Sequence, residues 1–165
     1  YTHHWTVNKV AKWQMIWPQL VTDYDCILDE ARNRGMTYDN SRVISGSNSI
    51  MLHGDGHSHE DFHLGPKAVG GWCKTVRKPY DVVVTAILLR ASKLAGAAIE
   101  VRSDGDWNEW TEGRKLVKAL SPEDDLSCPY EECVERKGID AIARTEKQPL
   151  CGHTILSFES HYTGR

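Results

Sequence analysis

The densest group of reactive side chains lies between His53 and His63. These 11 residues contain four histidines, two aspartates and one glutamate. Imidazole and carboxylate groups bind divalent metal ions, and they transfer protons near neutral pH. Gly54 and Gly56 argue against a helix here, so the His-x-x-x-His spacings do not indicate a helical metal motif. The segment is consistent with a metal or acid–base site, and equally with a solvated, histidine-rich loop.

Three cations precede the start of a predicted helix near Pro79. Lys74, Arg77 and Lys78 come before this proline, which suits the first turn of a helix. The free amides and the positive dipole end of a helix N-terminus favour an anion such as phosphate. Lys74 and Lys78 are the better candidates, because Arg77 is equally suited to a surface ion pair. The alternative is that all three cations face solvent.

Two aspartates follow a predicted strand. Asp104 and Asp106 belong to the turn that starts at Ser103, and sheets commonly place functional loops directly after a strand. Asp106, with Glu109 three residues later, has the spacing of a helix capping box, so we interpret it as a cap. For Asp104, a plain turn and a ligand-binding role both remain open.

The cysteines indicate neither a disulfide framework nor a zinc site. There are five of them, an odd number spread along the chain, so we expect reduced thiols as in a cytoplasm. Cys128, Cys133, Cys151 and His153 could supply four zinc ligands, but they lack the Cys-x-x-Cys spacing of a zinc knuckle. We therefore expect unpaired thiols and no bound zinc.

The composition is that of one soluble globular domain. The chain has 165 residues, of which 40% are hydrophobic and 26% charged. The longest apolar run, Val82–Leu89, is interrupted by Thr85 and is far shorter than the ~20 residues that span a bilayer, so we expect no membrane association. The net charge of −3 argues against a protein devoted to duplex DNA or anionic membranes, so any nucleic-acid or nucleotide binding must be local.

Residue periodicity predicts the elements that must position these side chains. Aromatic and β-branched residues predict a strand over 1–7, with His3 and Trp5 on one face. Apolar spacing predicts a main helix at about 18–34 that starts at Pro18, and a nearly all-apolar run predicts a central, heavily buried helix over 80–94. The other predicted elements are short strands at 42–45, 49–53, 59–64 and 98–102, a loop at 65–72 and a helix at 106–120.

The order of these elements predicts an α+β fold. An antiparallel sheet would carry helices mainly on one face, in a split βαβ, ferredoxin-like arrangement. Residues 1–120 would form the core domain. Residues 121–165 are polar and cysteine-bearing, and we expect them to be a C-terminal appendage of the same domain.

Four blocks of the sequence together resemble an uncharacterised family of small proteins encoded by bacteriophages and some bacteria. The similarity covers about residues 1–120, and the sequence departs from the family pattern at His4, usually tyrosine, and at Ser58, usually glycine. The resemblance implies a phage origin and the cytoplasm of a host bacterium, without naming a reaction. Within each block it favours His59, Glu60, Lys74, Lys78, Tyr80, Asp81 and Asp104. The blocks are Tyr1-Thr2-His3 with Trp5, His59-Glu60 with Phe62, Cys73-Lys74-Thr75 with Lys78-Pro79-Tyr80-Asp81, and Ser103-Asp104-Gly105-Asp106 with Trp110.

The leading hypothesis is an accessory protein that binds a phosphorylated small molecule, nucleotide-like, or a nucleic-acid end. Lys74 and Lys78 would hold phosphate, while His59 and Glu60 would transfer protons or hydrogen-bond the ligand. His3 would reach the same pocket from the first strand. Such a protein could counter nucleotide-signalled host immunity as a sponge or a hydrolase, so the sequence leaves open whether it is an enzyme. It specifies no cofactor.

Two alternatives come from other classes of protein. One is a non-enzymatic virion or interaction module in which the polar blocks are caps and turns. The other is a metal-dependent hydrolase built on residues 53–63. In any of these classes the chain could form a homo-oligomer. The leading hypothesis requires His59 and Lys78 to converge on one cleft, although they are far apart in the sequence.

Overall fold

The computed structural model describes residues 1–36, 44–46, 49–53 and 60–130. His57, His59, Cys133, Cys151 and His153 lie outside these ranges. The described residues confirm the α+β class, with three helices and antiparallel sheets. Within these ranges, no helix combines the length and the apolar character that crossing a bilayer requires.

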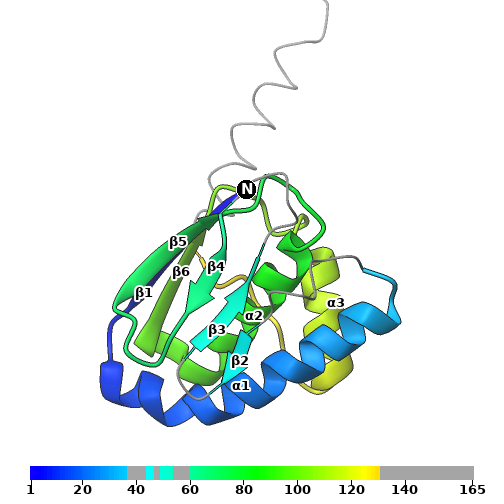
Figure 1. The fold of residues 1–165 in the computed structure, drawn as a ribbon. Helices are drawn as coiled ribbons and strands as arrows, with labels where there is room; N and C mark the ends of the chain where they lie inside the picture. The colour runs from blue at the N-terminus through cyan, green and yellow to red at the C-terminus, as the bar shows by residue number, and fades with distance from the viewer. Residues whose placement is uncertain (37–43, 47–48, 54–59, 131–165) are drawn as a thin grey trace, which may run out of the picture. The chain divides into compact units, whose positions relative to one another are not determined.

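The first sheet, sheet A, has three strands with the N-terminal strand at its centre. β1 (Thr2–Val7) pairs antiparallel with β5 (Gly70–Lys74) on one side and with β6 (Ile99–Ser103) on the other. Because both neighbours run against β1, they are parallel to each other. The connection from β5 through α2 to β6 is therefore a βαβ unit that β1 splits (Figure 1).

The second sheet, sheet B, is a three-stranded antiparallel meander. It contains β2 (Ile44–Gly46), β3 (Ser49–Leu52) and β4 (Phe62–Leu64), which correspond to the three short strands predicted there. The single predicted sheet is thus divided into two, and the ferredoxin-like detail is not confirmed.

The strand β5 was not predicted, since residues 65–72 were expected to form a loop. Its glycines are a consequence of packing. A Cβ atom on Gly71 would lie 2.6 Å from Cζ2 of Trp5, and one on Gly70 would lie 2.9 Å from the Trp5 carbonyl oxygen. The two glycines let β5 approach the buried Trp5 of its partner strand, so they do not mark a loop.

The first helix begins earlier than predicted. α1 (Val10–Asn33) contains Pro18 in its interior, whereas the sequence predicted a start there. The two turns before the proline are held by tertiary contacts, because Trp13 and Trp17 are buried with their ring centroids 5.7 Å apart. This packing compensates for the amide hydrogen bond that a proline cannot donate.

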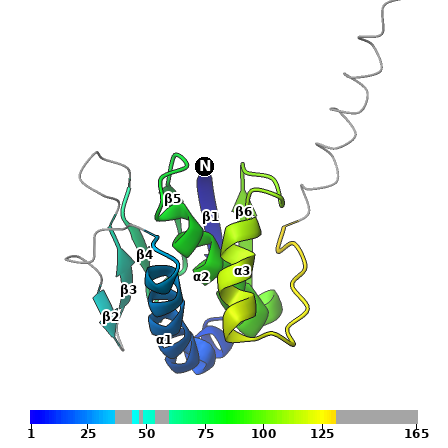
Figure 2. The same cartoon turned by 90° about the vertical axis from the view of Figure 1, so that its right-hand side faces the viewer.

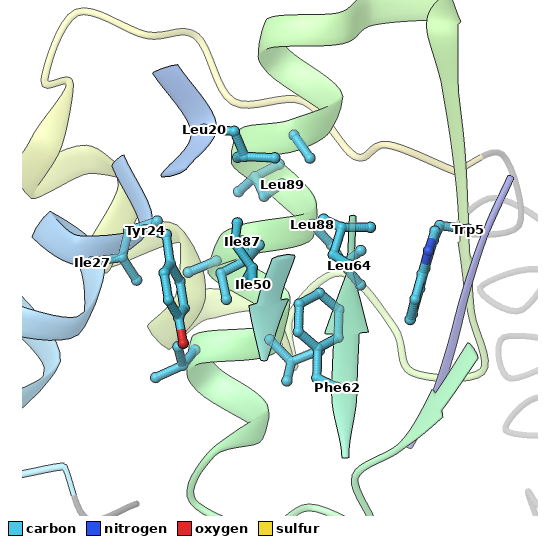
Figure 3. Packing of buried hydrophobic residues seen from close by; sticks show 14 of the residues in the cluster. Trp5, Leu20, Tyr24, Ile27, Ile50, Phe62, Leu64, Ile87, Leu88 and Leu89 are labelled. Carbon is cyan, nitrogen blue, oxygen red and sulfur yellow. The ribbon is translucent and has the colours of Figure 1, made fainter. Parts of the chain in front are cut away.

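The helix α2 (Asp81–Ala95) is the core of the molecule, as predicted. Ten of its 15 residues are buried. It packs against α1, α3 (Thr111–Leu120) and β6, and the three helices lie on the same side of sheet A (Figure 2). Ile87 and Leu88 of α2 lie among Ile50, Phe62 and Leu64 of sheet B, with Trp5 of sheet A beyond them (Figure 3).

Residues 121–130 follow α3 and are held against the helices. Asp124 forms an ion pair with Arg90 of α2 at 2.6 Å. The buried Tyr130 packs its ring on Trp110, with the centroids 5.4 Å apart, and donates a hydrogen bond to the Gly105 carbonyl oxygen at 2.9 Å. This part of the predicted appendage therefore shares the packing of the core.

Candidate functional site

Four chain segments meet at one end of sheet A. Because β1 is antiparallel to both neighbours, its start lies beside the ends of β5 and β6. Thr2 is in register with Lys74, and His3 is in register with Ser103. The N-terminus of α2 joins them through Asp81. The structure thus brings the predicted site residues His3, Lys74, Tyr80, Asp81 and Asp104 to the same end of the sheet.

At this end, His3 is completely buried, and both of its ring nitrogens have partners. Nε2 lies 2.8 Å from Oδ1 of Asp81, and Nδ1 lies 3.0 Å from Oγ of Ser103. The Asp81 carboxylate also accepts a hydrogen bond from the Thr75 hydroxyl. The Gly105 amide donates to Ser103 Oγ at 3.0 Å.

Hydrogen bonds link Ser103 to His3 and His3 to Asp81, as in the Ser-His-Asp triad of a hydrolase, but these side chains are buried. His3 is 0% exposed and Ser103 is 4% exposed. The Trp110 ring packs edge-on against the His3 imidazole, with the centroids 5.4 Å apart. A nucleophile must be reachable by its substrate. We therefore assign this network the role of fixing the segments in place.

Thr75 and Ser103 are members of this network that the sequence did not reveal as site residues. A weak signal existed for Ser103, because strand alternation places it on the same buried face of β6 as Val101.

The buried Tyr80 and the exposed Glu60 belong to a second set of contacts. The Tyr80 hydroxyl donates to the carbonyl oxygens of Glu60, at 3.1 Å, and of Lys74, at 3.2 Å. Glu60 Oε2 accepts the backbone amide of Lys74 at 3.0 Å, and Cys73 Sγ lies 3.2 Å from the Glu60 carbonyl oxygen. These contacts join the residues before β4 to the edge of β5. Burial raises the pKa of Tyr80, and it raises that of the Cys73 thiol to about 12.

The turn before α2 has a strained backbone. Val76 and Arg77 have φ angles of 48° and 58°, which non-glycine residues rarely adopt, and the Lys78 amide closes the turn on the Thr75 carbonyl at 3.0 Å. The Arg77 guanidinium lies over the Tyr1 ring, 4.8 Å from its centroid. Lys78 itself is half-buried. Its predicted convergence with His59 stays a prediction, since His59 is not described.

Asp104 and Asp106 act as turn and cap residues. Asp104 is exposed, and its Oδ1 accepts the Thr2 amide at 2.8 Å. The Glu109 amide donates to Asp106 Oδ1 at 3.1 Å, and the Asp106 amide donates to Glu109 Oε2 at 2.8 Å. This reciprocal pair is the predicted capping box, although α3 itself begins two residues after Glu109.

The outer face of sheet A carries exposed side chains that could contact a ligand. Trp72 of β5 is 53% exposed, and it is in register with His4 of β1, which is in register with Arg102 of β6. Lys74, two residues after Trp72, is exposed beside this row. The sequence analysis missed Trp72 as a site residue because it placed residues 65–72 in a loop. Once β5 is known, alternation from the buried Cys73 puts Trp72 on the outer face.

Among the residues that the structure describes, no three His, Cys, Asp or Glu side chains are grouped as metal ligands would be. His53 Nδ1 lies 2.8 Å from Asp61 Oδ2, which ties the end of β3 to the start of β4.

No family model, curated protein or solved structure matches the chain. The function of the site must therefore follow from the geometry of its own residues.

Proposed function

We propose that the outer face of sheet A binds single-stranded nucleic acid. The observation that carries the proposal is the row of Trp72, His4 and Arg102 across three neighbouring strands, in which the Trp72 side chain is half-exposed. Bases that are not paired stack on exposed aromatic rings, and cations beside the ring hold the phosphates.

The spacing of these side chains suits an extended ligand. Trp72 and Lys74 point to the same face and are about 7 Å apart along β5, while neighbouring strands are ~4.8 Å apart. Trp72 would stack on a base, and Lys74 and His4 would contact the adjacent phosphates. Arg102 already pairs with Glu100 at 2.7 Å, so it is a weaker phosphate ligand. Among the described strands of sheet A, few cations lie on this face, which fits a short ligand and an overall charge of −3.

The ligand proposed here still bears phosphate, as the sequence analysis expected. Its binding site, however, is the outer face of sheet A instead of a pocket that includes His3. His3, Tyr80 and Asp81 are buried and hydrogen-bonded within the protein, so their positions support the sheet rather than a ligand. Lys74 is common to both versions.

The proposal is tested by fluorescence anisotropy with labelled single-stranded DNA and RNA oligomers at low salt. Stacking on a tryptophan stabilises a complex by ~1–3 kcal/mol, so Trp72→Ala should weaken binding about 5- to 150-fold. Trp72→Phe should retain most of the affinity. Met15→Ala is the control, because Met15 is 80% exposed on α1, away from sheet A.

Two outcomes would overturn the proposal. The first is that the wild-type chain binds no oligomer of either kind. The second is that Trp72→Ala binds as tightly as wild type while circular dichroism shows it folded. Either result would favour the interaction-module alternative, in which Trp72, with Val69 and Val76 exposed on the flanks of β5, contacts a protein.

A further inference from the structure

A small cavity lies between α3 and the segment that follows it. After the helix ends at Leu120, the chain turns back and runs beside α3 (Figure 2). The cavity between them has a volume of about 360 Å³, which is within the usual range for small-molecule sites. It is lined by Thr111, Arg114, Lys115, Lys118, Asp125 and Leu126.

The helix α3 supplies three cations to this cavity from a fixed position. It buries Gly113, Leu116 and Val117. Thr111 and the residues three, four and seven positions after it lie on the opposite face, because a helix turns once in 3.6 residues. A Cβ atom on Gly113 would lie 2.4 Å from Thr85 Oγ1 of α2, so the glycine lets the two helices pack closely. The cations are therefore carried by a helix that is held against the core.

Arg114 is held in place without being neutralised. Its guanidinium lies over the Trp107 ring, 4.5 Å from the centroid, and its Nη2 donates to Thr111 Oγ1 at 2.7 Å. Its Nε is buried and finds no hydrogen-bond acceptor among the described residues, and no described carboxylate pairs with the guanidinium. A planar guanidinium that is already fixed by stacking loses little freedom when it binds an anion. Arg114 is thus prepared for an anionic ligand.

The two lysines add positive charge beside Arg114. Lys118 Nζ donates to the carbonyl oxygen of Pro122 at 2.9 Å, which leaves its charge uncompensated. Lys115 forms an exposed ion pair with Glu112, which is not part of the cavity lining. Arg114 and Lys118 are four residues apart on the helix, a spacing at which like charges repel each other. An anion bound between them removes this repulsion.

The opposite wall of the cavity offers a carboxylate and an apolar side chain. This wall is anchored to α2, because Asp124 pairs with Arg90 at 2.6 Å and Lys93 Nζ donates to the Asp125 carbonyl oxygen at 3.0 Å. The Asp125 carboxylate is exposed and has no cationic partner among the residues that the structure describes. It can accept hydrogen bonds from ligand hydroxyl groups, while Leu126 contacts ligand carbon atoms.

We propose that this cavity binds a small phosphate monoester that also carries hydroxyl groups. Arg114 and Lys118 bind the phosphate oxygens, and Asp125 accepts hydrogen bonds from the hydroxyl groups. The lining has three cations and one carboxylate, which suits the charge of about −1.5 to −2 on a phosphate monoester better than the single charge of a carboxylate. The proposal does not depend on nucleic-acid binding, because α3 lies on the other side of sheet A from the outer face (Figure 2).

Isothermal titration calorimetry of the full chain with glycerol 3-phosphate at low salt tests this site. Wild type should bind one equivalent, more tightly than it binds glycerol or glycerate, which carries a carboxylate in place of the phosphate. Arg114→Gln removes the guanidinium and should weaken binding at least about 10-fold, since hydrogen bonds between charged groups are lost. Arg114→Lys should restore only part of the affinity, because lysine keeps the charge but not the planar group. Lys118→Gln should also weaken binding.

Lys12→Gln is the matched control. Lys12 is an exposed cation near the start of α1, whereas α1 approaches Lys115 at its other end, through Arg34. This variant should bind glycerol 3-phosphate as wild type does, and so should Trp72→Ala, whose change lies on the outer face of sheet A.

Three results would overturn the proposal. The first is a wild-type chain that does not bind glycerol 3-phosphate. The second is glycerate that binds as tightly as glycerol 3-phosphate. The third is an Arg114→Gln variant that is folded by circular dichroism and either keeps the wild-type affinity or loses no more of it than Lys12→Gln does.

Discussion

Cys73 and Tyr80 are polar side chains whose protonation is fixed by their surroundings. Cys73 is 0% exposed and Tyr80 is 1% exposed, and both contact the Glu60 carbonyl oxygen. Burial raises the pKa of Cys73 to about 12 and raises that of Tyr80 as well, because a charged form would lose its hydration. Both groups therefore remain neutral in the folded protein near neutral pH.

The raised pKa of Cys73 predicts that the protein becomes less stable in alkali. The unfolded chain ionises this thiol near pH ~8.5, whereas the folded chain keeps its proton up to about pH 12. Unfolding thus releases a proton between these values, and the free energy of unfolding falls as pH rises, by up to ~1.4 kcal/mol per pH unit from this group. Below pH ~8 the thiol adds no pH dependence.

Urea unfolding at several pH values between 7 and 11 measures this effect. Cys73→Ala should be less stable at pH 7 but should show a shallower decline with pH than wild type. Cys26→Ala is the control, because Cys26 is exposed, and it should follow the wild-type slope. Parallel slopes for all three proteins would contradict the prediction.

The elements that were predicted correctly are those whose signals are local. Strand alternation located β1 and β6, and the spacing of Asp106 and Glu109 located the cap before α3. A nearly uniform apolar composition identified α2 as central. In each case the pattern that predicts the element lies within the residues of that element.

The elements that were missed depend on contacts with distant residues. β5 contains Gly70 and Gly71 because Trp5 of another strand lies against them, and α1 extends before Pro18 because Trp13 and Trp17 are buried. The same reason limits site prediction. Sequence blocks pointed to His3 and Asp81, but only the three-dimensional structure shows that the two side chains contact each other and are buried.

Burial of α2 predicts that shortening one of its core side chains is costly. Leu88 is 0% exposed and lies among Phe62, Leu64 and Trp5. Leu88→Ala should lower the free energy of unfolding by about 2–5 kcal/mol, because it removes apolar contacts and leaves a cavity. Met15→Ala, on the exposed face of α1, should change it by less than about 0.5 kcal/mol. Denaturant unfolding that gave similar values for both variants would show that α2 is not the core.

At the scale of the whole molecule, the polar network around His3 joins segments that are far apart in the sequence. It connects β1 with the turn at Thr75, the start of α2 at Asp81 and the end of β6 at Ser103. Tyr130 extends it by bonding to Gly105, whose amide contacts Ser103. Buried networks of this kind specify one arrangement of the chain, because each unpaired member is costly.

Removing the central acceptor of this network should therefore destabilise the entire fold. Asp81→Ala removes the acceptor that the His3 ring and the Thr75 hydroxyl share. The hydroxyl then keeps only the Tyr1 carbonyl oxygen, at 3.2 Å, and an unsatisfied buried group costs ~1–3 kcal/mol. The expected loss in the free energy of unfolding is about 2–5 kcal/mol in a single cooperative transition. Asp29→Ala is the control, because that carboxylate is 71% exposed in its ion pair with Arg32 and should contribute under about 1 kcal/mol. Adding His3→Ala to Asp81→Ala should cost less than the sum of the two single variants, since both break the same bond. Strict additivity, or equal losses for the two aspartates, would mean that the network does not hold these segments together.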